Sequence, residues 1–440
     1  MKDIWFGYWF KNWFFPYKIG YLIVISGIRS YFKNHSYKGK NNIPNNAGII
    51  YAVNHQNAFL DPIVIAGRSR HPTYFLTRAD IFKKPIVAKL LSKLYMLPIY
   101  RQRDGSNSMK KNEKTFNDCY DILAEKGKLI IFPEGNHNYK KSLRPLKKGI
   151  ARIALGAGEK YNFKIPIYIV PIGLDYENHF NMNGDLFLNA GNPIYVNAYY
   201  DRYLNEPAET INELTSTVYE SLKKLMININ DIENYTNLYY LVHKLPFKKK
   251  LLSVEEKFFY KQSRLYELEK LNNDNFDEYQ SIIRKTTSLI KFCKKEKIRP
   301  YLFQKNYTLT GLIFYSLIML LLMPFHLIGL ITNYIPYILP VIFTENKIED
   351  KHFHGSLKFA LGVILFYIYW LLLILAIYMW QGLEISLFSA IFLPLIAVFN
   401  FKYWIHLKKL SGALKYTLKK GKSEFISMKK DFDYIYSVIH

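Results

Sequence analysis

A histidine and an aspartate six positions apart are the first residues whose types and spacing could support chemistry. His55 follows the apolar run 49–53, and Asp61 directly precedes Pro62. The run predicts a buried strand that leads into a loop, and Pro62 suits the first turn of a helix, which puts Asp61 at a helix N-cap. An imidazole and a carboxylate at that corner could take a proton from a hydroxyl group. Taken alone, the stretch fits better a surface histidine and a capping aspartate without a catalytic role.

Three further stretches place distinctive residues at the ends of apolar runs. One ends in Arg101 and Arg103. Their guanidinium groups suit bidentate contacts to a phosphate, although ordinary surface arginines fit equally well. Another runs through Phe-Pro into Glu134 and Gly135, where the carboxylate could bind a hydroxyl group or a neighbouring arginine. A basic flank follows it: Lys140, Lys141, Arg144, Lys147 and Lys148. The last stretch, 169–172, is apolar and suits the wall of a tunnel.

Residues 34–200 predict an α/β domain that would position these side chains. Short apolar runs alternate with helical patterns, which favours a mostly parallel-type sheet with crossover helices. Polar residues at the strand ends would then meet at one edge of the sheet, where such folds bind ligands. The predicted strands are 49–53, 73–77, 97–100, 129–132, 167–172 and 193–197, and the predicted helices are 62–67, 85–95, 108–126 and 147–158.

The remaining segments predict membrane attachment and a helical connector. Residues 1–33 are rich in aromatic side chains and predict an interfacial anchor, with a helix packed on the domain as the alternative. Residues 201–306 are polar and helical in pattern. Residues 307–402 predict two transmembrane hairpins, one at 357–401 and one at 309–343 that is broken by Pro324 and could be re-entrant. A soluble helical domain is the alternative for 309–343. Residues 403–440 form a lysine-rich tail, which the positive-inside rule places in the cytoplasm together with the connector.

The charge and composition narrow the class of partner. The chain carries 60 Lys and Arg against 35 Asp and Glu, a net charge of +25, and half of its residues are hydrophobic. The charge predicts an anionic partner. The long apolar runs favour anionic membrane lipids, and no nucleic-acid recognition motif accompanies the lysines. The two cysteines, Cys119 and Cys293, indicate a reducing compartment. We therefore expect a cytoplasmic-facing integral membrane protein, in the inner or plasma membrane of a bacterium.

In this order and at these spacings, the four stretches resemble the glycerolipid acyltransferase family. Members of that family acylate glycerol 3-phosphate or lysophosphatidic acid. The resemblance rests on Asn54-His55 with Asp61-Pro62, the Arg101–Arg103 stretch, Phe-Pro-Glu134-Gly135 and Val-Pro-Ile, and it covers roughly residues 35–200. Five residues separate His55 from Asp61, one more than in the family's His-x4-Asp block. Asn136 and His137 replace the family's common Thr-Arg.

The resemblance implies a role for each of these residues. His55 would act as the general base and Asp61 would orient it, so that the hydroxyl group attacks the thioester of acyl-CoA or acyl carrier protein. Arg103, supported by Arg101, would bind the phosphate of the acceptor. The other implied substrate contacts are Asn54, Glu134, Gly135 and Lys148. The resemblance implies no metal and no cofactor besides the acyl donor. Another lysolipid as acceptor, or a non-catalytic lipid-binding protein of the same fold, are the alternatives.

Overall fold

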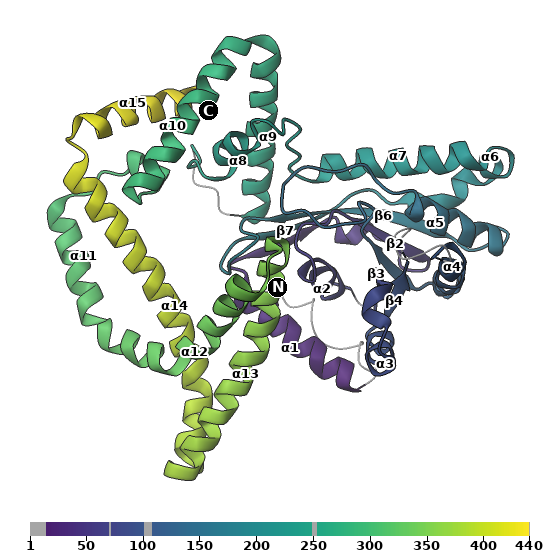
Figure 1. The fold of residues 1–440 in the computed structure, drawn as a ribbon, viewed down its shortest axis with the longest axis horizontal. Coiled ribbons are helices and arrows are strands. Elements are labelled where there is room, and N and C mark those ends of the chain that lie inside the picture. The colour runs from purple at the N-terminus through teal and green to yellow at the C-terminus, as the bar shows by residue number, and fades with distance from the viewer. Residues whose placement is uncertain (1–14, 70–71, 101–107, 249–252, 440) are drawn as a thin grey trace. The chain divides into compact units, whose positions relative to one another are not determined.

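The computed structural model describes residues 15–69, 72–100, 108–248 and 253–439 (Figure 1). The chain divides into two compact units. The first contains the described residues up to Asn228 together with Asp350–Phe359, and the second contains Ile229–Glu349 and the chain from Ala360 onward. By its contacts, the short segment Asp350–Phe359 therefore belongs to the N-terminal unit, far from it in sequence.

A mostly parallel sheet forms the centre of the first unit. Its strands are β1 (His35–Lys38), β2 (Gly48–Val53), β3 (Tyr74–Arg78), β4 (Met96–Ile99), β5 (Lys128–Ile131), β6 (Ile167–Tyr176), β7 (Leu186–Ala190) and β8 (Ile194–Tyr195). The strand order is β1-β7-β6-β2-β5-β3-β4, and β8 pairs with β6. β2 pairs in parallel with β5 on one side and β6 on the other. The loops that follow β2 and β5 therefore emerge side by side at one edge of the sheet.

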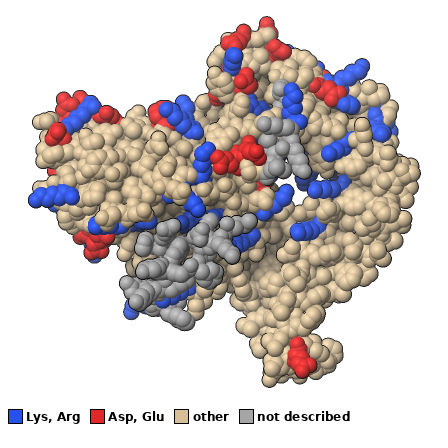
Figure 2. Space-filling model, turned by 180° about the vertical axis from the view of Figure 1, so that it is seen from behind, with Lys and Arg blue, Asp and Glu red and all other residues tan. Residues whose placement is uncertain are grey.

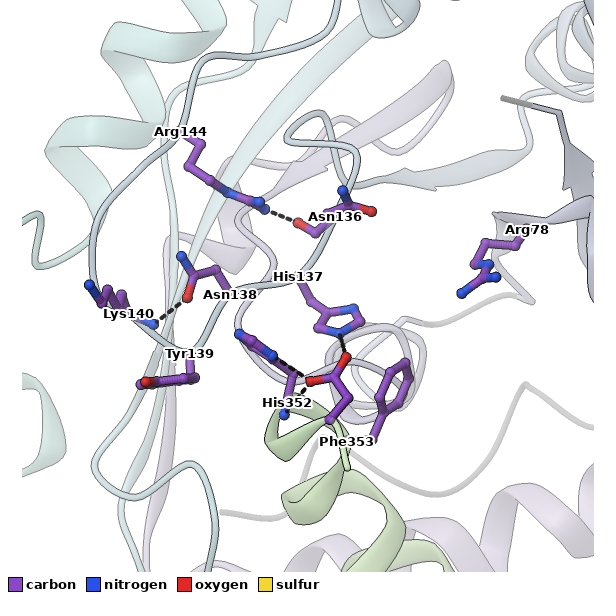
Figure 3. A pocket seen from close by; sticks show the side chains of 10 residues that line it. Arg78, Asn136, His137, Asn138, Tyr139, Lys140, Arg144, His352 and Phe353 are labelled. Atoms are coloured by element: carbon purple, nitrogen blue, oxygen red, sulfur yellow. Dashed lines mark hydrogen bonds and ion pairs between the residues drawn. The ribbon is translucent and has the colours of Figure 1, made fainter. Parts of the chain in front are cut away.

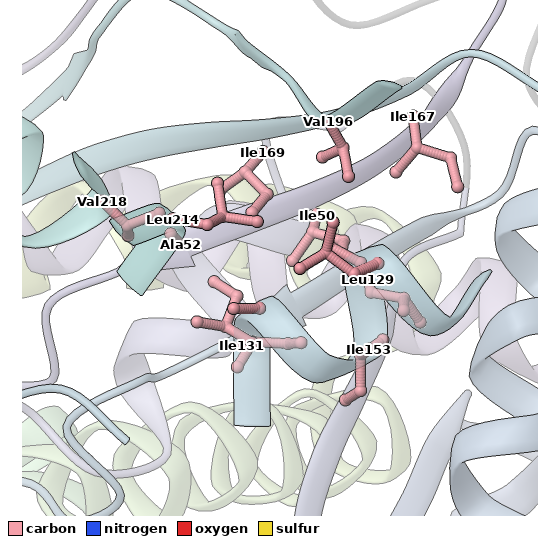
Figure 4. Close-up of a cluster of buried hydrophobic side chains, with 14 of the residues drawn as sticks. Ile50, Ala52, Leu129, Ile131, Ile153, Ile167, Ile169, Val196, Leu214 and Val218 are labelled. Carbon is pink, nitrogen blue, oxygen red and sulfur yellow. The ribbon is translucent and has the colours of Figure 1, made fainter. Parts of the chain in front are cut away.

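Helices α4 (Ser108–Ala124), α5 (Gly149–Lys160) and α7 (Pro207–Leu225) cover one face of the sheet. Alternate residues of a strand point to the same face, so every second residue of the central strands enters one apolar layer. Figure 4 shows this layer, which includes Ile50, Ala52, Leu129, Ile131, Ile167 and Ile169 from the strands and Ile153, Leu214 and Val218 from the helices. Two shorter helices complete this part of the unit, α3 (Pro85–Lys93) and α6 (Tyr200–Asn205).

The opposite face of the sheet carries α2 (Leu60–Ala66) and the end of α1 (Phe15–Tyr31). Tyr176 of β6 lies an odd number of positions from Ile167 and Ile169, the residues of that strand in the apolar layer. Successive residues of a strand point to opposite faces, so Tyr176 points to this face. Its hydroxyl group reaches Asp61 of α2, and its ring lies 5.9 Å from the ring of Phe32, centroid to centroid. This face positions the residues of the candidate site.

Helix α1 packs against α2 along one of its sides. The Tyr21 hydroxyl group donates a hydrogen bond to the Gly67 carbonyl oxygen at 3.4 Å, and Ile25 and Ile28 are buried. Ile19 and Leu22 of the same helix are exposed. An interfacial anchor at residues 1–33 stays a prediction, because residues 1–14 lie outside the described residues.

The structure confirms the predicted α/β fold. The four predicted strands between 49 and 132 match β2 to β5 to within one residue, and the four predicted helices match α2 to α5 to within two. β6 runs four residues beyond its predicted end, and the last predicted strand shortens to the two residues of β8. β1 and β7 were not predicted. β1 is a polar edge strand, His-Ser-Tyr-Lys, without an apolar run, and β7 is fully buried but follows a polar segment that reads as a loop.

All the regular elements of the second unit are helices, among its described residues. Its α-helices are α8 (Tyr235–His243), α9 (Val254–Asp274), α10 (Phe276–Glu296), α11 (Leu309–Leu321), α12 (Met323–Lys347), α13 (His354–Gln381), α14 (Leu383–Lys419) and α15 (Ser423–Val438). The part of α13 that belongs to this unit begins at Ala360. The segment from 403 to 438 continues as the end of α14 and as α15. α15 packs on α10, where the rings of Phe292 and Phe425 lie 4.9 Å apart. The lysine-rich segment is therefore an ordered part of this unit.

Three helical stretches in the described part of the chain are long and apolar enough to cross a membrane: Met323–Lys347, Lys351–Gln381 and Leu383–Lys419. α11 is apolar but shorter. α12 begins beside Pro324, where the sequence predicted a break, and α13 and α14 meet at Gly382. Figure 2 shows that charged side chains are sparse over the protruding end where these two helices meet. The apolar helices suggest that the protein associates with a membrane.

Candidate active site

The structure brings His55 and Asp61 into direct contact. Nδ1 of His55 lies 2.7 Å from Oδ2 of Asp61. A carboxylate can only accept a hydrogen bond, so Nδ1 of the neutral imidazole carries the proton and Nε2 is left as the acceptor. The imidazole also stacks on Phe132 of the neighbouring strand end, with ring centroids 4.1 Å apart and ring planes 19° apart. Its tautomer and its orientation are therefore both defined by neighbours.

Asp61 is held in place by the loop that separates it from His55. Its Oδ2 also accepts hydrogen bonds from the backbone N–H groups of Gln56 and Asn57, both at 2.8 Å. The loop thereby accommodates the five intervening residues by wrapping around the carboxylate. The predicted N-cap position is wrong, since the helix begins at Leu60 with Phe59 as its N-cap, and Asp61 lies in the first turn. The carboxylate accepts hydrogen bonds from N–H groups that precede it in the chain, whereas an N-cap side chain accepts from N–H groups that follow it.

Tyr176 supplies a further contact to the same carboxylate. Its hydroxyl group donates to Oδ1 of Asp61 at 2.7 Å, and both side chains are fully buried. Burial and the neighbouring carboxylate raise the pKa of the Tyr176 phenol well above its usual range, so it stays a donor. Both oxygens of Asp61 are therefore occupied, and the carboxylate cannot rotate without losing hydrogen bonds.

Glu134 joins the end of β5 to the histidine loop. Its Oε1 accepts a hydrogen bond from the His55 backbone N–H at 2.8 Å, and its Oε2 lies 3.1 Å from Nε of Arg144. Burial raises the pKa of Glu134, and the hydrogen bonds from His55 and Arg144 oppose this shift. Gly135 follows at φ +78°, a left-handed conformation that favours glycine. The turn thus positions the histidine loop through its backbone.

The other residues predicted to bind substrate fall into three groups. Asn54 is fully buried, and its amide donates to the carbonyl oxygen and accepts from the N–H of Leu174, so it braces β2 against β6. Lys148 is exposed at the start of α5. Arg101 and Arg103 lie outside the described residues. Lys141 of the basic flank is fully buried and forms an ion pair with Asp175, which gives it a structural role.

A cavity of about 550 Å³ lies beside the His55–Asp61 pair. Its walls are Arg78, the segment from Asn136 to Lys140, Arg144, Asp350, His352 and Phe353 (Figure 3). His137 connects this cavity to the His55–Asp61 pair, since its ring meets the His55 ring edge-on with centroids 5.5 Å apart. Burial, together with the neighbouring His55 and His352, lowers the pKa of His137 to about 4, so His137 is neutral near pH 7. The cavity thus combines cationic side chains with a neutral imidazole and with the carboxylate of Asp350.

Sequence reasoning missed Tyr176, Arg78 and the wall formed by Asp350, His352 and Phe353. Tyr176 lies 115 positions from Asp61, and the wall lies more than 200 positions from His137. No local spacing connects such residues. Arg78 ends β3 at the same edge as the other strand ends, so the rule that was applied to Arg101 and Arg103 could have identified it.

Comparisons with known proteins find similarity to acyltransferases. Residues 34–175 match the sequence model of the family described as Acyltransferase. Glycerol-3-phosphate O-acyltransferase 2 of Saccharomyces cerevisiae is 34% identical over 123 residues, which cover 28% of this chain and 16% of the yeast protein. The 1-acyl-sn-glycerol-3-phosphate acyltransferase of Borreliella burgdorferi is 27% identical over 161 residues, which cover 37% of this chain and 58% of the relative. The chain therefore spans less than two thirds of either relative.

A solved structure is also similar, the 1-acyl-sn-glycerophosphate (LPA) acyltransferase PlsC of Thermotoga maritima. The match has a TM-score of 0.34 and a sequence identity of 19%, and it covers 47% of this chain and 80% of that chain.

Proposed function

We propose, from the acyltransferase domain in residues 34–175, that this protein is a membrane-bound O-acyltransferase. It transfers a fatty acyl group from acyl-CoA or acyl carrier protein to a hydroxyl group of glycerol 3-phosphate or lysophosphatidic acid. The observation that carries the proposal is the contact between His55 and Asp61, at the edge of a sheet and beside a cavity lined by cationic side chains. The named relatives act on glycerol phosphates, which is the acceptor class that this cavity suits.

In the proposed reaction, His55 is the general base. Nε2 takes the proton of the acceptor hydroxyl group while its oxygen attacks the thioester carbonyl carbon. The C–S bond then breaks, and the imidazolium returns the proton to the departing thiolate. Asp61 keeps Nδ1 protonated and stabilises the positive charge that forms on the ring. Because a thioester is already activated, this transfer needs no cofactor besides the acyl donor.

The acceptor phosphate would lie against the cations of the cavity. Arg78 and Arg144 present guanidinium groups, which suit phosphate oxygens. Arg144 is committed to Glu134 and to the Asn136 carbonyl oxygen, and Arg78 pairs with Asp80 at an exposed position. Breaking the exposed Arg78–Asp80 ion pair to bind a phosphate should therefore cost less free energy than breaking the contacts of Arg144. Arg101 and Arg103 stay proposed phosphate ligands from their place in the sequence.

The apolar helices would keep the site beside the membrane, where acyl chains partition. Withdrawing an acyl chain into water costs about 0.8 kcal/mol per methylene group, so a site at the lipid surface avoids that cost. We place the lysine-rich segment from 403 onward on the cytoplasmic side, where anionic lipids attract it by about 1 kcal/mol per basic residue near the surface.

The test is an in vitro assay of the full-length, detergent-solubilised protein, with glycerol 3-phosphate and lysophosphatidic acid as competing acceptors and acyl-CoA or acyl carrier protein as donor. We expect His55→Ala to abolish transfer while His35→Ala, a half-buried histidine in the edge strand β1, retains it. Near-normal activity of His55→Ala would remove the general-base assignment. A wild-type protein that binds lipid but transfers nothing to any lysolipid would favour the non-catalytic alternative.

The phosphate contacts are tested in the same assay. We expect Arg78→Ala and Arg103→Ala each to raise the KM of the acceptor at least tenfold and to leave the KM of the acyl donor almost unchanged. An equal effect on both substrates would place the substituted arginine outside the phosphate site.

A further inference from the structure

Three potential metal ligands converge at the rim of the cavity. Among the residues that the structure describes, His137, Asp350 and His352 form a group whose potential ligand atoms all lie within 4.8 Å of one another. Figure 3 shows His137 and His352 on the same wall of the cavity, and each of them contacts the carboxylate of Asp350. Two imidazoles and a carboxylate are a donor set that first-row transition metals favour.

The distances are close to those that a metal requires. Nε2 of His137 lies 3.8 Å from Oδ2 of Asp350, and Nδ1 of His352 lies 2.6 Å from Oδ1. Metal–ligand bonds of about 2.0–2.1 Å set the donors of a tetrahedral site about 3.3 Å apart. The first distance is about 0.5 Å longer and the second about 0.7 Å shorter than this spacing, and the two involve different oxygens of Asp350. Rotations of the Asp350 and His352 side chains can adjust both distances, because both side chains are partly exposed.

The backbone that carries Asp350 and His352 is fixed on the α/β unit. Phe353 packs between Phe59 and His137, with ring centroids 5.4 and 4.6 Å away. Gly355 lies so close to the loop between β6 and β7 that a Cβ added to it would come within 1.9 Å of the His179 carbonyl oxygen. The close packing at Gly355 and the ring contacts of Phe353 hold the segment beside His137.

We propose that His137, Asp350 and His352 bind one divalent transition-metal ion, with Zn²⁺ as the preferred ion. The three side chains line the cavity, so coordination positions that they leave free are open to water or to an anionic oxygen. Arg144 and Arg78 line the same cavity and would repel a cation, but each is paired with a carboxylate. The ion would fasten the Asp350–Phe359 segment to the loop after β5.

Metal binding by these residues does not require acyl transfer, so the test is independent of the proposed function. The full-length protein is purified in detergent without a polyhistidine tag, treated with a chelator and dialysed against Zn²⁺. We expect one tightly bound ion per chain, and a Kd at least tenfold higher in Asp350→Ala and in His352→Ala. Lys351→Ala changes the exposed residue between these ligands, and His406→Ala removes a histidine outside the group. Both controls should bind Zn²⁺ as the wild type does.

Equal Zn²⁺ affinity in the wild type and in an Asp350→Ala/His352→Ala double variant would overturn the proposal. So would a uniform loss in all four single variants, which would show that binding does not depend on the three ligands. A titration of the wild type with Co²⁺ needs no variant. We expect visible absorption bands that saturate at one equivalent and disappear when Zn²⁺ is added. The absence of a saturating band would also refute the site.

Discussion

Asp61→Asn isolates the charge of the carboxylate from its shape. The asparagine carbonyl oxygen can replace Oδ2 and still accept hydrogen bonds from His55 Nδ1 and from the two backbone N–H groups of the loop. The amide nitrogen would then face Tyr176, whose hydroxyl group can rotate to accept a hydrogen bond. The fold should therefore survive, and the variant should lose mainly the negative charge that faces the imidazolium ion.

The geometry bounds the size of this effect. Unit charges 2.7 Å apart attract each other by about 6 kcal/mol at an effective dielectric constant of about 20. This figure is an upper bound, because the imidazole is 16% exposed and solvent screens its charge. Each 1.36 kcal/mol corresponds to a factor of ten in rate, so the upper bound is a little above 10⁴-fold. General-base catalysis contributes about 10²- to 10⁴-fold in enzymes. We therefore expect kcat to fall by about 10²- to 10⁴-fold, with little change in either KM.

The assay is steady-state acyl transfer by the detergent-solubilised protein, with thermal unfolding measured on the same samples. Asp118→Asn makes the same chemical change at an exposed position of α4 and should behave as the wild type. A double variant with His55→Ala should be no slower than His55→Ala alone, because the two residues act as a unit. A stable Asp61→Asn protein with kcat within tenfold of the wild type would refute this reasoning.

Three further predictions test the support of the site. Tyr176→Phe should cost about 1–3 kcal/mol of unfolding free energy and lower kcat without changing KM, measured by denaturant titration and kinetics, because a buried carboxylate oxygen loses its donor. Gly135→Ala should destabilise the protein by about 1–2 kcal/mol in the same titration through its φ of +78°, whereas Gly149→Ala, which has open space around it, should not. Burial raises the pKa of Glu134, so the folded state binds the proton of this carboxyl group more tightly than the unfolded state does. The free energy of unfolding should therefore fall as the pH rises from the usual glutamate pKa of about 4.3 to the raised pKa of the folded state. Glu134→Gln should remove that part of the decline in a pH series of melting temperatures, and the exposed Glu125→Gln should not.

The predicted part of the fold is the part that local pattern determines. The apolar runs that became β2 and β5 are buried on both faces of a parallel sheet, and such strands read as continuous hydrophobic segments. Because their carboxyl ends lie side by side, the sequence also predicted that His55 and Glu134 would meet. The contact between His55 and Asp61 was predictable for a different reason, because only six positions separate the loop histidine from the aspartate in the first turn of the next helix.

The unpredicted part depends on contacts between distant segments. β1 has no hydrophobic pattern of its own and is a strand because it pairs with β7, about 150 positions away. The two oxygens of Asp61 illustrate the same limit. Oδ2 binds donors of the adjacent loop, whereas Oδ1 binds Tyr176 from a strand 115 positions later. Nothing in the neighbourhood of Asp61 indicates that donor.

The wall formed by Asp350, His352 and Phe353 limits what similarity can transfer to this protein. The family match ends at residue 175, and the wall lies in the segment that precedes α13. Residues inside the match supply the His55–Asp61 pair and the Glu134 turn, which suffice for the proposed proton transfer. Residues outside it line the cavity next to His137 and bear on the space and charge available to an acceptor. If the proposed acyl transfer is correct, we expect acceptor choice to depend on this part of the chain, which the family match does not cover. Substitutions in this wall should then change the preference between glycerol 3-phosphate and a bulkier lysolipid.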